Sequence, residues 1–347
     1  MHIRNNYIVR ERVSLKACNS FGLEVSAAYY AEITHPDEFL KLMDTGVYQT
    51  GPRFILGGGS NVLFSDDYQG LIIRNNIPGI SLIAEDEQTV RVRTGAGVVW
   101  DDLVRHTIEK GWGGLENLSM IPGLTGAAPI QNIGAYGVEL DQVFYSLDAL
   151  SLETGRQRQF HREECRFGYR DSIFKSGQKD QWLITSVTLT LNKKPKINTD
   201  FGNLVAVLSG WGIRKPDIRD ISRAVRHIRS TKLPDPATTG NAGSFFKNPI
   251  VPDSRYSELQ KMYPDLPGYP SGSSQMKIPA AWLIDHCGYK GFRSGDAGIH
   301  EHHALIIVNY GNATGRQLID LAKQIQYSVF QTFGIQLEPE VNIIGPK

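Results

Sequence analysis

The sequence predicts an α+β protein with two or three domains. The chain has 347 residues, whereas single domains usually hold roughly 50 to 250. Short apolar or alternating runs favour strands at residues 54–56, 71–74, 90–93 and 186–191. Helical spacing of apolar residues occurs only in scattered segments among these runs. This mixture favours α+β over a doubly wound sheet, in which strands and helices would alternate regularly.

Three segments have the apolar spacing of amphipathic helices. The first spans residues 100–110 and is followed by a glycine, a typical stop signal. The second spans residues 221–228. The third begins at a capping box formed by Thr314 and Gln317 and ends at Gly334. The apolar faces consist of Trp100, Leu103, Val104 and Ile108; of Ile221, Val225 and Ile228; and of Leu318, Leu321, Ile325 and Val329.

Two segments rich in proline and glycine interrupt the regular elements. Residues 231–240 are interpreted as a domain linker. Residues 263–275 are too polar and too interrupted to form a core. They form either a plain surface loop or a mobile lid, and Tyr269 at the centre is the side chain that a lid would use.

The composition describes an ordinary globular protein and excludes several classes. Hydrophobic residues make up 41% and charged residues 21%. Lys and Arg number 37 against 36 for Asp and Glu, so no net field would recruit nucleic acid or a membrane surface. The first ten residues lack the apolar region of a secretion signal. Cys18, Cys165 and Cys287 are far apart, which fits a reducing cytoplasm and offers neither a disulfide framework nor a metal motif.

The most unusual segment runs from Asn117 to Val138 without a charged residue. A membrane span also needs roughly 20 apolar residues, but the glycines, prolines and amides here would leave backbone groups unsatisfied in lipid. Glycine allows a close approach of the backbone, and grouped N–H groups can hold anionic oxygens. The segment is either a ligand-binding loop system or a turn-rich connection in the core, and its length favours binding.

A second glycine loop, residues 57–61, follows the predicted strand at 54–56. A dinucleotide fingerprint needs a third glycine where Val62 stands and a helix after it, whereas residues 62–64 look extended. A Rossmann site is therefore disfavoured. Either a phosphate-holding turn or a purely structural turn explains the glycines.

Three single residues are candidates for chemistry, and each also has a structural explanation. Ser244 lacks the G-x-S-x-G elbow and has no histidine nearby in sequence, so an ordinary turn serine is the alternative. Arg170 and Glu340 are isolated charges among apolar neighbours. Such residues are usually paired when buried, and the alternative is a structural salt bridge, for Arg170 near Asp171.

Two clusters of polar residues have weaker functional signals. The run from His300 to His303 lacks a further ligand at a fixed spacing, so a metal site is disfavoured. The basic positions of the second helix and its end are interpreted as a solvated face, with a phosphate contact as the alternative. These positions are Arg223, Arg226, Arg229 and Lys232.

Six motifs span almost the whole chain. They are G-G-G-S-N-V-L-F-S-D (57–66), G-L-E-N-L-S-M-I-P-G (114–123), P-I-Q-N-I-G-A-Y-G-V-E (129–139), F-G-Y-R-D-S-I-F-K (167–175), K-L-P-D-P…G-N-A-G-S-F-F-K-N-P (232–249) and L-E-P-E-V-N-I-I-G (337–345). Together, in this order, they closely resemble the family of UDP-N-acetylenolpyruvoylglucosamine reductases, bacterial flavoenzymes that make UDP-N-acetylmuramate for peptidoglycan. The loop around Tyr269 is similar to that of the longer subtype, in which a tyrosine-bearing loop closes over the substrate.

The resemblance implies a two-subdomain FAD-binding unit of the vanillyl-alcohol-oxidase type, followed by an α/β substrate-binding domain. The expected FAD-binding subdomains are residues 1–78 and 79–233. The substrate-binding domain is expected at 234–334, and residues 335–347 are expected to return to the active site.

FAD is the cofactor that the resemblance implies. It is expected to bind non-covalently, because no histidine lies between His35 and His106 and no cysteine between Cys18 and Cys165 to anchor it. Its pyrophosphate is expected near Gly57, Gly58, Gly59, Ser60 and Asn61, and its ring system near Ile121, Pro122, Gly123, Gln131, Asn132, Gly134, Ala135 and Tyr136.

The resemblance also implies the reaction. NADPH would reduce FAD at N5 and leave, and the enolpyruvyl ether of UDP-N-acetylglucosamine would take its place. Hydride would pass to the outer alkene carbon while charge builds at the carbon that bears the carboxylate, which needs positive or hydrogen-bonding partners. Arg170 and Glu340 match the family residues in that role. Ser244 matches the general acid that protonates this carbon.

The substrate contacts follow from the same resemblance, with two departures from the family pattern. Phe201-Gly202 stands where the family often has tyrosine before glycine, which removes one hydroxyl contact. His303 stands where glutamine is common, which adds pH sensitivity. The matching positions are Lys232, Asn248, Tyr269, Lys290 and His303.

Two alternative functions stay open at this point. One is an FAD-dependent oxidase or dehydrogenase on the same fold that acts on another alcohol or lactone. The other is a non-catalytic UDP-sugar binder that retains the fold. The expected enzyme is cytoplasmic, acts on a small molecule and has no nucleic-acid, membrane or metal partner. Its oligomeric state cannot be read from the sequence, and a monomer is the expectation.

Overall fold

The computed structural model describes residues 9–201 and 203–345, which form two compact units. Unit 1 comprises residues 9–13, 27–59 and 69–231, and unit 2 comprises the rest of the described chain. Two short segments from the N-terminal part thus cluster with the C-terminal residues, whereas the predicted domains are continuous stretches. The functions assigned to those domains stay predictions. Gly202 of the expected Phe201-Gly202 departure lies outside the described residues, as do most of the first ten residues.

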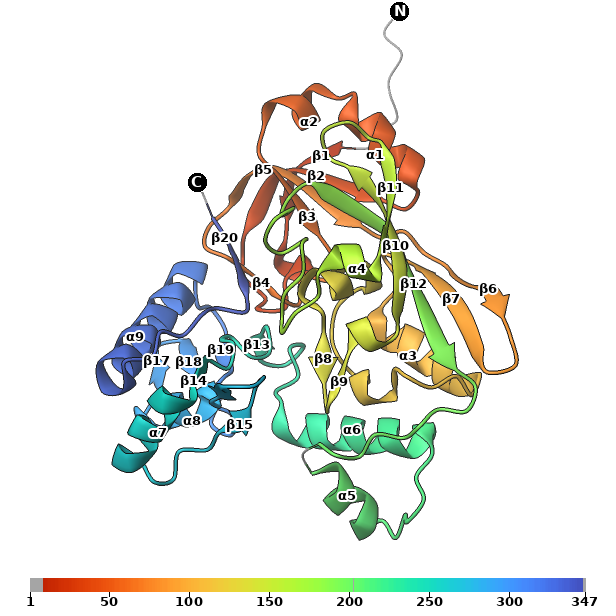
Figure 1. The fold of residues 1–347 in the computed structure, drawn as a ribbon. Helices are drawn as coiled ribbons and strands as arrows, with labels where there is room; N and C mark the ends of the chain where they lie inside the picture. Colours follow the sequence, from red (N-terminus) through yellow and green to blue (C-terminus); the bar gives the residue numbers. More distant parts are fainter. Residues whose placement is uncertain (1–8, 202, 346–347) are drawn as a thin grey trace, which may run out of the picture. The chain divides into compact units, whose positions relative to one another are not determined.

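Unit 1 contains a four-stranded sheet in the order β1-β2-β5-β3. Strand β3 runs parallel to β5, and two helices connect β2 to β3 (Figure 1). Phe39 and Leu42 of the first helix pack with Leu71 and Ile73 of β5 in a buried cluster. The elements are β1 (Val9–Ser14), β2 (Ser26–Ile33), α1 (Pro36–Met43), α2 (Gly46–Thr50), β3 (Arg53–Leu56) and β5 (Tyr68–Asn75).

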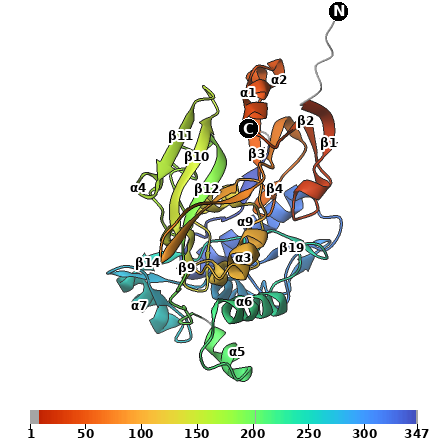
Figure 2. The same ribbon diagram turned by 90° about the vertical axis from the view of Figure 1, so that its right-hand side faces the viewer.

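A five-stranded sheet in the order β11-β10-β12-β7-β6 forms the rest of the β-structure core of unit 1. All neighbouring strands are antiparallel, and Figure 2 shows β10, β11 and β12 side by side. The short helix α4 follows β11. The elements are β6 (Ile80–Glu85), β7 (Thr89–Gly95), β10 (Phe144–Ser151), β11 (Gln157–His161), α4 (Arg162–Cys165) and β12 (Trp182–Asn192).

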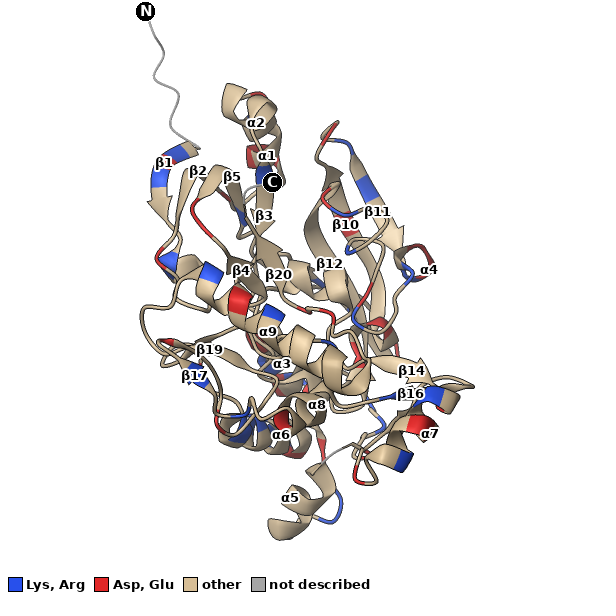
Figure 3. Cartoon of the chain, turned by 90° about the vertical axis from the view of Figure 1, so that its left-hand side faces the viewer, with Lys and Arg blue, Asp and Glu red and all other residues tan. Residues whose placement is uncertain are grey.

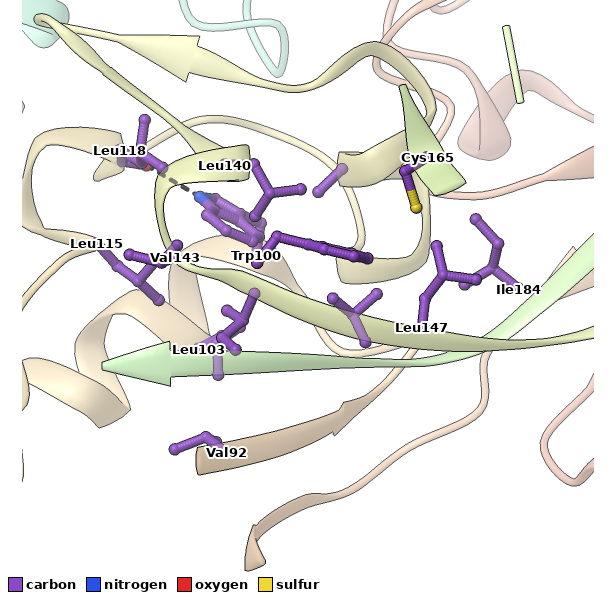
Figure 4. Packing of buried hydrophobic residues seen from close by; sticks show 14 of the residues in the cluster. Val92, Trp100, Leu103, Leu115, Leu118, Leu140, Val143, Leu147, Cys165 and Ile184 are labelled. Carbon is purple, nitrogen blue, oxygen red and sulfur yellow. Dashed lines mark hydrogen bonds between the residues drawn. The ribbon is translucent and has the colours of Figure 1, made fainter. Parts of the chain in front are cut away.

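Helix α3 (Trp100–Glu109) packs against this sheet through the apolar face that the sequence predicts. Trp100, Leu103 and Val104 are buried, and Ile108 is half-buried. The indole Nε1 of Trp100 donates a hydrogen bond of 3.0 Å to the carbonyl oxygen of Leu118 (Figure 4). A buried indole N–H needs such a partner, so this bond ties the start of α3 to the uncharged segment.

The uncharged segment is largely irregular, as expected of a loop system. It contains 3-10 helices and two short strands, β8 (Gly134–Ala135) and β9 (Val138–Glu139). No helix in the described part of the chain is long and apolar enough to cross a membrane. The 3-10 helices around it span Glu116–Leu118, Thr125–Gln131 and Leu140–Gln142.

Helices α5 (Leu204–Gly210) and α6 (Ile218–Lys232) complete unit 1 with a small apolar cluster of their own. Ile221, Val225 and Ile228 are buried in it, as predicted. Because α6 continues to Lys232, the predicted start of the linker at residue 231 is wrong by two residues.

Unit 2 consists of small sheets with helices beside them. One sheet has the strand order β13-β19-β18-β17, another has the order β14-β16-β15, and β20 pairs in parallel with β4. The strands are β4 (Val62–Phe64), β13 (Gly240–Asn241), β14 (Ile250–Pro252), β15 (Tyr269–Pro270), β16 (Gln275–Lys277), β17 (Arg293–Ser294), β18 (Ala297–Ile299), β19 (Ile307–Asn309) and β20 (Asn342–Ile344). The helices are α7 (Asp253–Met262), α8 (Ala280–His286) and α9 (Gly315–Phe333).

Helix α9 begins and ends where the sequence predicts. The Gln317 N–H donates to Oγ1 of Thr314 at 3.3 Å, and the Thr314 N–H donates to Oε1 of Gln317 at 2.8 Å. Gly334 ends the helix in a left-handed conformation with φ of 65°. A Cβ on Gly315 would lie 1.8 Å from the carbonyl oxygen of Phe64. Glycine at this position lets α9 begin directly against β4. Figure 3 shows that basic and acidic residues alternate along α9.

The predicted fold class is confirmed, and the four predicted strands lie inside longer ones, β3, β5, β7 and β12. Among the elements that the sequence analysis missed are the strands β1, β2, β6, β10 and β11 and the helices α1, α2, α4, α5, α7 and α8. The segment at 263–275 forms a short hairpin, in which Tyr269 of β15 pairs with Lys277 of β16. The Tyr269 side chain is 57% exposed.

Candidate active site

The two glycine loops of unit 1 lie directly against each other. A Cβ on Gly58 would lie only 2.8 Å from the Cα of Gly123, and a Cβ on Gly57 would lie 3.4 Å from the Cβ of Ala127. Any side chain at residue 58 would therefore push two backbones apart. The geometry brings together residues that the sequence could only assign to separate loops.

The start of α3 fixes the second of these loops. The backbone N–H of Trp100 donates to the carbonyl oxygen of Gly123 at 3.0 Å, and the N–H of Thr125 donates to that of Val98 at 2.8 Å. Two residues of this loop, Met120 and Gly123, have positive φ values of 61° and 120°. The loop thus presents bare backbone in a fixed conformation.

Asn132 shapes the next turn of the uncharged segment. Its side-chain NH₂ donates to Glu139 at 3.0 Å and to the carbonyl oxygen of Gly168 at 3.2 Å, and its oxygen accepts from the N–H of Asp141 at 3.0 Å. Asn132 is 1% exposed and has a left-handed φ of 44°. Its side chain is committed to the protein, so a ligand at this position would meet backbone.

Tyr136 and Arg229 form a charged and polar pair at the end of the same segment. Burial raises the pKa of the Tyr136 hydroxyl, and the charge of Arg229 opposes that rise. Burial lowers the pKa of Arg229, and the charges of Tyr136 and Asp101 oppose that fall. Within the described chain, Nε of Arg229 has no hydrogen-bond acceptor. The interpretation of the arginines of α6 as a solvated face is therefore wrong for Arg229.

Arg226 contradicts the same interpretation, because it forms a two-bond ion pair with Asp101. Arg223 is exposed, and its guanidinium lies 4.4 Å from the centre of the Trp211 ring. Lys232 is also exposed. The helical spacing placed all four basic residues on one side of the helix. It could not predict which of them forms an ion pair with a carboxylate of another helix.

Arg170 is held beside the uncharged segment. Its Nη2 donates a hydrogen bond of 2.5 Å to the carbonyl oxygen of Gly134, and its Nη1 lies 4.0 Å from a carboxylate oxygen of Glu139. Glu139 is thus an acidic neighbour of Arg170. Arg170 has a φ of 53°, which costs about 1–2 kcal/mol for a residue with a side chain. Such strain is found preferentially at functional sites.

In unit 2, a tight turn presents Ser244. The N–H of Gly243 donates to Oδ1 of Asn241 at 2.9 Å, and Gly243 has a φ of 70°. Phe245 and Phe246, which follow, are almost fully buried. Ser244 itself is exposed, so the turn projects its hydroxyl while the two aromatic rings anchor the chain.

Glu340 lies beside this turn through backbone pairing. The N–H of Glu340 donates to the carbonyl oxygen of Phe245 at 2.8 Å, and the N–H of Phe245 donates to that of Leu305 at 2.8 Å. Nδ2 of Asn61 donates to the carbonyl oxygen of Glu340 at 3.2 Å. Unit 2 therefore brings Ser244, Glu340 and Asn61 into one neighbourhood, whereas Arg170 belongs to unit 1.

Three of the predicted substrate contacts share a positive field in unit 2. Burial lowers the pKa of His303, and the charges of His300, Lys232 and Lys290 lower it further. Nδ1 of His303 accepts from the N–H of Leu305 at 3.4 Å, which leaves Nε2 as the protonated nitrogen of the neutral ring. Such a group of donors suits an anion with several oxygens.

The other two predicted contacts differ in their environment. Oδ1 of Asn248 accepts from the N–H of Ala280 at 2.9 Å, at the start of α8, so its NH₂ group is the part that can donate to a ligand. Tyr269 is exposed on its hairpin. A hollow of about 360 Å³ lies between α7 and this hairpin, and Pro270, next to Tyr269, lines it.

A metal centre finds no support in the described residues. They contain no group of three or more histidine, cysteine, aspartate or glutamate side chains placed to hold a metal ion. His302 instead lies 3.6 Å from Glu301, and both are largely exposed.

Comparisons with known proteins decide the family. Residues 27–160 match the model of an FAD-binding domain, and residues 235–344 match the C-terminal domain of UDP-N-acetylenolpyruvoylglucosamine reductase. The reductase of Amoebophilus asiaticus is 47% identical over 97% of this chain and 99% of its own length. That of Pseudomonas fluorescens strain Pf-5 is 46% identical over 96% and 98%. The chain belongs to the UDP-N-acetylenolpyruvoylglucosamine reductase family.

The solved structures agree with this assignment. The crystal structure of UDP-N-acetylenolpyruvylglucosamine reductase from Thermus caldophilus is 25% identical and has a TM-score of 0.66. The match covers 96% of this chain and 99% of that one. The fold class predicted from the reductase resemblance, an FAD-binding part followed by the C-terminal domain, is confirmed.

FAD is the cofactor of this reductase family member, and the residues of unit 1 fit it. The backbones at Gly58 and Gly123 approach too closely for a side chain at residue 58. Because no side chain covers them, backbone N–H groups of these loops could bind the oxygens of a pyrophosphate. The buried Nε of Arg229 lacks an acceptor within the described chain, and an oxygen of a ring system or phosphate would supply one. The individual FAD contacts stay predictions.

Replacement of Gly58 by Ala tests the contact between the glycine loops. The new Cβ would meet the backbone of Gly123 at 2.8 Å, so the loops must separate, and we expect FAD to bind at least about tenfold more weakly. Gly46→Ala is the matched control, because nothing lies within 4 Å of its added Cβ. Titration of the FAD-free proteins with FAD measures both, and equal affinities would contradict the role of the contact.

Replacement of His303 by Gln tests the electrostatics of unit 2. The folded pKa of His303 lies below its ordinary value of 6.5, so at pH below about 6.5 the unfolded chain binds more protons than the folded one. The wild type should therefore lose stability as the pH falls through 6.5 toward the lowered pKa, and His303→Gln should lose less. Melting temperatures between pH 7 and pH 5 measure this, with the exposed His302→Gln as control. Parallel curves for His303→Gln and the wild type would refute the assignment.

Proposed function

We propose that the protein reduces UDP-N-acetylglucosamine enolpyruvate to UDP-N-acetylmuramate, with NADPH as the source of hydride. The observation that carries the proposal is the 47% identity to a reductase of this name over nearly the full length of both chains. The presence of both family models on one chain supports it further. The reaction belongs to peptidoglycan synthesis, and we expect it to occur in the cytoplasm by a monomeric enzyme.

When bound, FAD would supply the two-electron chemistry that carries hydride from NADPH to the outer alkene carbon of the substrate. The protein must then stabilise the charge that builds on the carbon bearing the carboxylate. Arg170 is suited to this because a hydrogen bond to the carbonyl oxygen of Gly134 fixes its guanidinium beside the uncharged segment. A preorganised cation of this kind stabilises a developing enediolate without reorganisation.

Glu340 and Ser244 complete the proposed catalytic set. Glu340 is held beside the Ser244 turn by the backbone bond to Phe245, and in this role it is protonated or hydrogen-bonded to the substrate carboxylate. Ser244 gives its hydroxyl proton to the carbanionic carbon. Serine is a weak acid, but an enolate carbon is basic enough to take that proton. The exposed position of Ser244 on its turn supports this role.

The positive group in unit 2 supports recognition of the nucleotide diphosphate. Lys232, Lys290 and His303 share an electrostatic field, and lysine suits the pyrophosphate oxygens. Lys290 is also 3.2 Å from Asp285, so it would exchange that partner for phosphate. Tyr269 is proposed to contact the uridine and Asn248 the sugar. Phe201, whose ring packs edge-on to Tyr136 at 6.3 Å, cannot make the hydroxyl contact that a tyrosine would.

An assay of NADPH consumption by the FAD-loaded protein tests the proposal. Consumption that depends on UDP-N-acetylglucosamine enolpyruvate is the expected result. Slow consumption that depends only on oxygen would favour the oxidase alternative. No consumption, with UDP-sugar binding intact, would favour a non-catalytic binder.

Replacement of Ser244 by Ala separates the two half-reactions. NADPH should still bleach the flavin absorbance, because no proton from Ser244 is needed there. Overall turnover should fall by about 10²–10⁴-fold, the usual contribution of general acid catalysis. Ser254→Ala, at an exposed position of α7, should keep wild-type turnover. Unchanged turnover in Ser244→Ala would eliminate this assignment.

A further inference from the structure

The carboxylate of Asp101, in the first turn of α3, is surrounded by donors from three segments of unit 1. Its Oδ1 accepts from the backbone N–H of Met120 at 2.6 Å and from Nη2 of Arg226 at 2.5 Å. Its Oδ2 accepts from Nη1 of Arg226 at 2.9 Å and lies 3.0 Å from Nη2 of Arg105. One side chain therefore joins α3, α6 and the loop that begins at Met120.

Burial and the neighbouring donors have opposite effects on the pKa of the Asp101 carboxyl. Burial alone would raise the pKa of this carboxyl, but the hydrogen bonds from Arg226 and Met120 and the charges of Arg226 and Arg105 hold it below its usual range. The side chains of Asp101 and Arg226 are only 16% and 27% exposed. Bidentate pairs of this geometry are stronger than ordinary surface ion pairs.

The loop needs such a support because its conformation is strained. Met120 has a left-handed φ of 61° although it is not glycine, and its side chain is 39% exposed, so packing does not hold it. The residue before it is fixed by a hydroxyl contact of 2.8 Å between Ser119 and Ser222 of α6. Helix α6 thus holds both Ser119 and, through Asp101, the N–H of Met120.

We propose that Asp101 and Arg226 are positioning residues that hold the loop at residues 119–123 in the conformation that receives the flavin ring. They act through the Met120 N–H and set the affinity and surroundings of the flavin. The inference rests on the proposed location of the ring system at residues 121–123. Arg105 does not share the role, because it is 59% exposed and contacts Asp101 from one turn further along α3.

The test compares Arg226→Met and Asp101→Asn with the control Arg105→Met. Arg226→Met removes the two charged bonds and leaves Asp101 free to turn away from Met120. Asp101→Asn keeps the size of the side chain but replaces one carboxylate oxygen by an NH₂ group that cannot accept, so the side chain no longer holds both Arg226 and the Met120 N–H. For each protein we would measure the dissociation constant of FAD, the absorption spectrum of bound flavin and the melting temperature.

Both variants should bind FAD about tenfold or more weakly, because they lose the charge-assisted hydrogen bonds that hold the loop, and their flavin bands should shift. Arg105→Met should stay within about threefold of the wild type, as expected of an exposed pair. Lower melting temperatures with unchanged FAD affinity and flavin spectrum would overturn the proposal, because the ion pair would then only stabilise the fold. An equal loss in Arg105→Met would overturn it too. Failure of the wild type to bind FAD would instead overturn the FAD site itself.

Discussion

The contact between bare backbones at Gly58 and Gly123 is the constraint on which the two glycine loops of unit 1 depend. Because a Cβ on Gly58 would lie 2.8 Å from the Cα of Gly123, no side chain fits at the contact itself. On either side of the contact, Leu118 and Ala128 anchor the uncharged segment in the main apolar cluster. Between these buried residues, hydrogen bonds from neighbouring elements set the conformation of the backbone.

The start of α3 supplies those bonds, and this explains why so buried a helix carries its polar contacts in its first turn. The indole of Trp100 reaches Leu118, its backbone N–H reaches Gly123, and Asp101 reaches Met120. The same tryptophan is part of the main apolar cluster of unit 1. Packing in the core is thereby transmitted to the backbone of the loop around Gly123.

The sequence predicted the helices α3, α6 and α9 well because their apolar spacing and end signals are local. The long strand β10 escaped because burial on both faces removes alternation, as its almost continuous burial illustrates. The motif residues of the site came from the family resemblance, not from any local pattern. The ion pair between Arg226 and Asp101 was not predictable, because its partners are 125 residues apart and depend on how two helices pack.

Several residues of unit 1 have a strained backbone conformation that depends on contacts with other parts of the chain. Met120, Asn132, Tyr136 and Arg170 are among the residues of unit 1 that have positive φ without being glycine. This conformation costs about 1–2 kcal/mol for most side chains and less for asparagine. Three of these side chains have partners that glycine could not supply: Asn132 builds a turn, Arg170 holds a cation beside Gly134, and the charge of Arg229 acts on Tyr136. Met120 differs from them, because its conformation depends on a neighbour, through the bond from its N–H to Asp101.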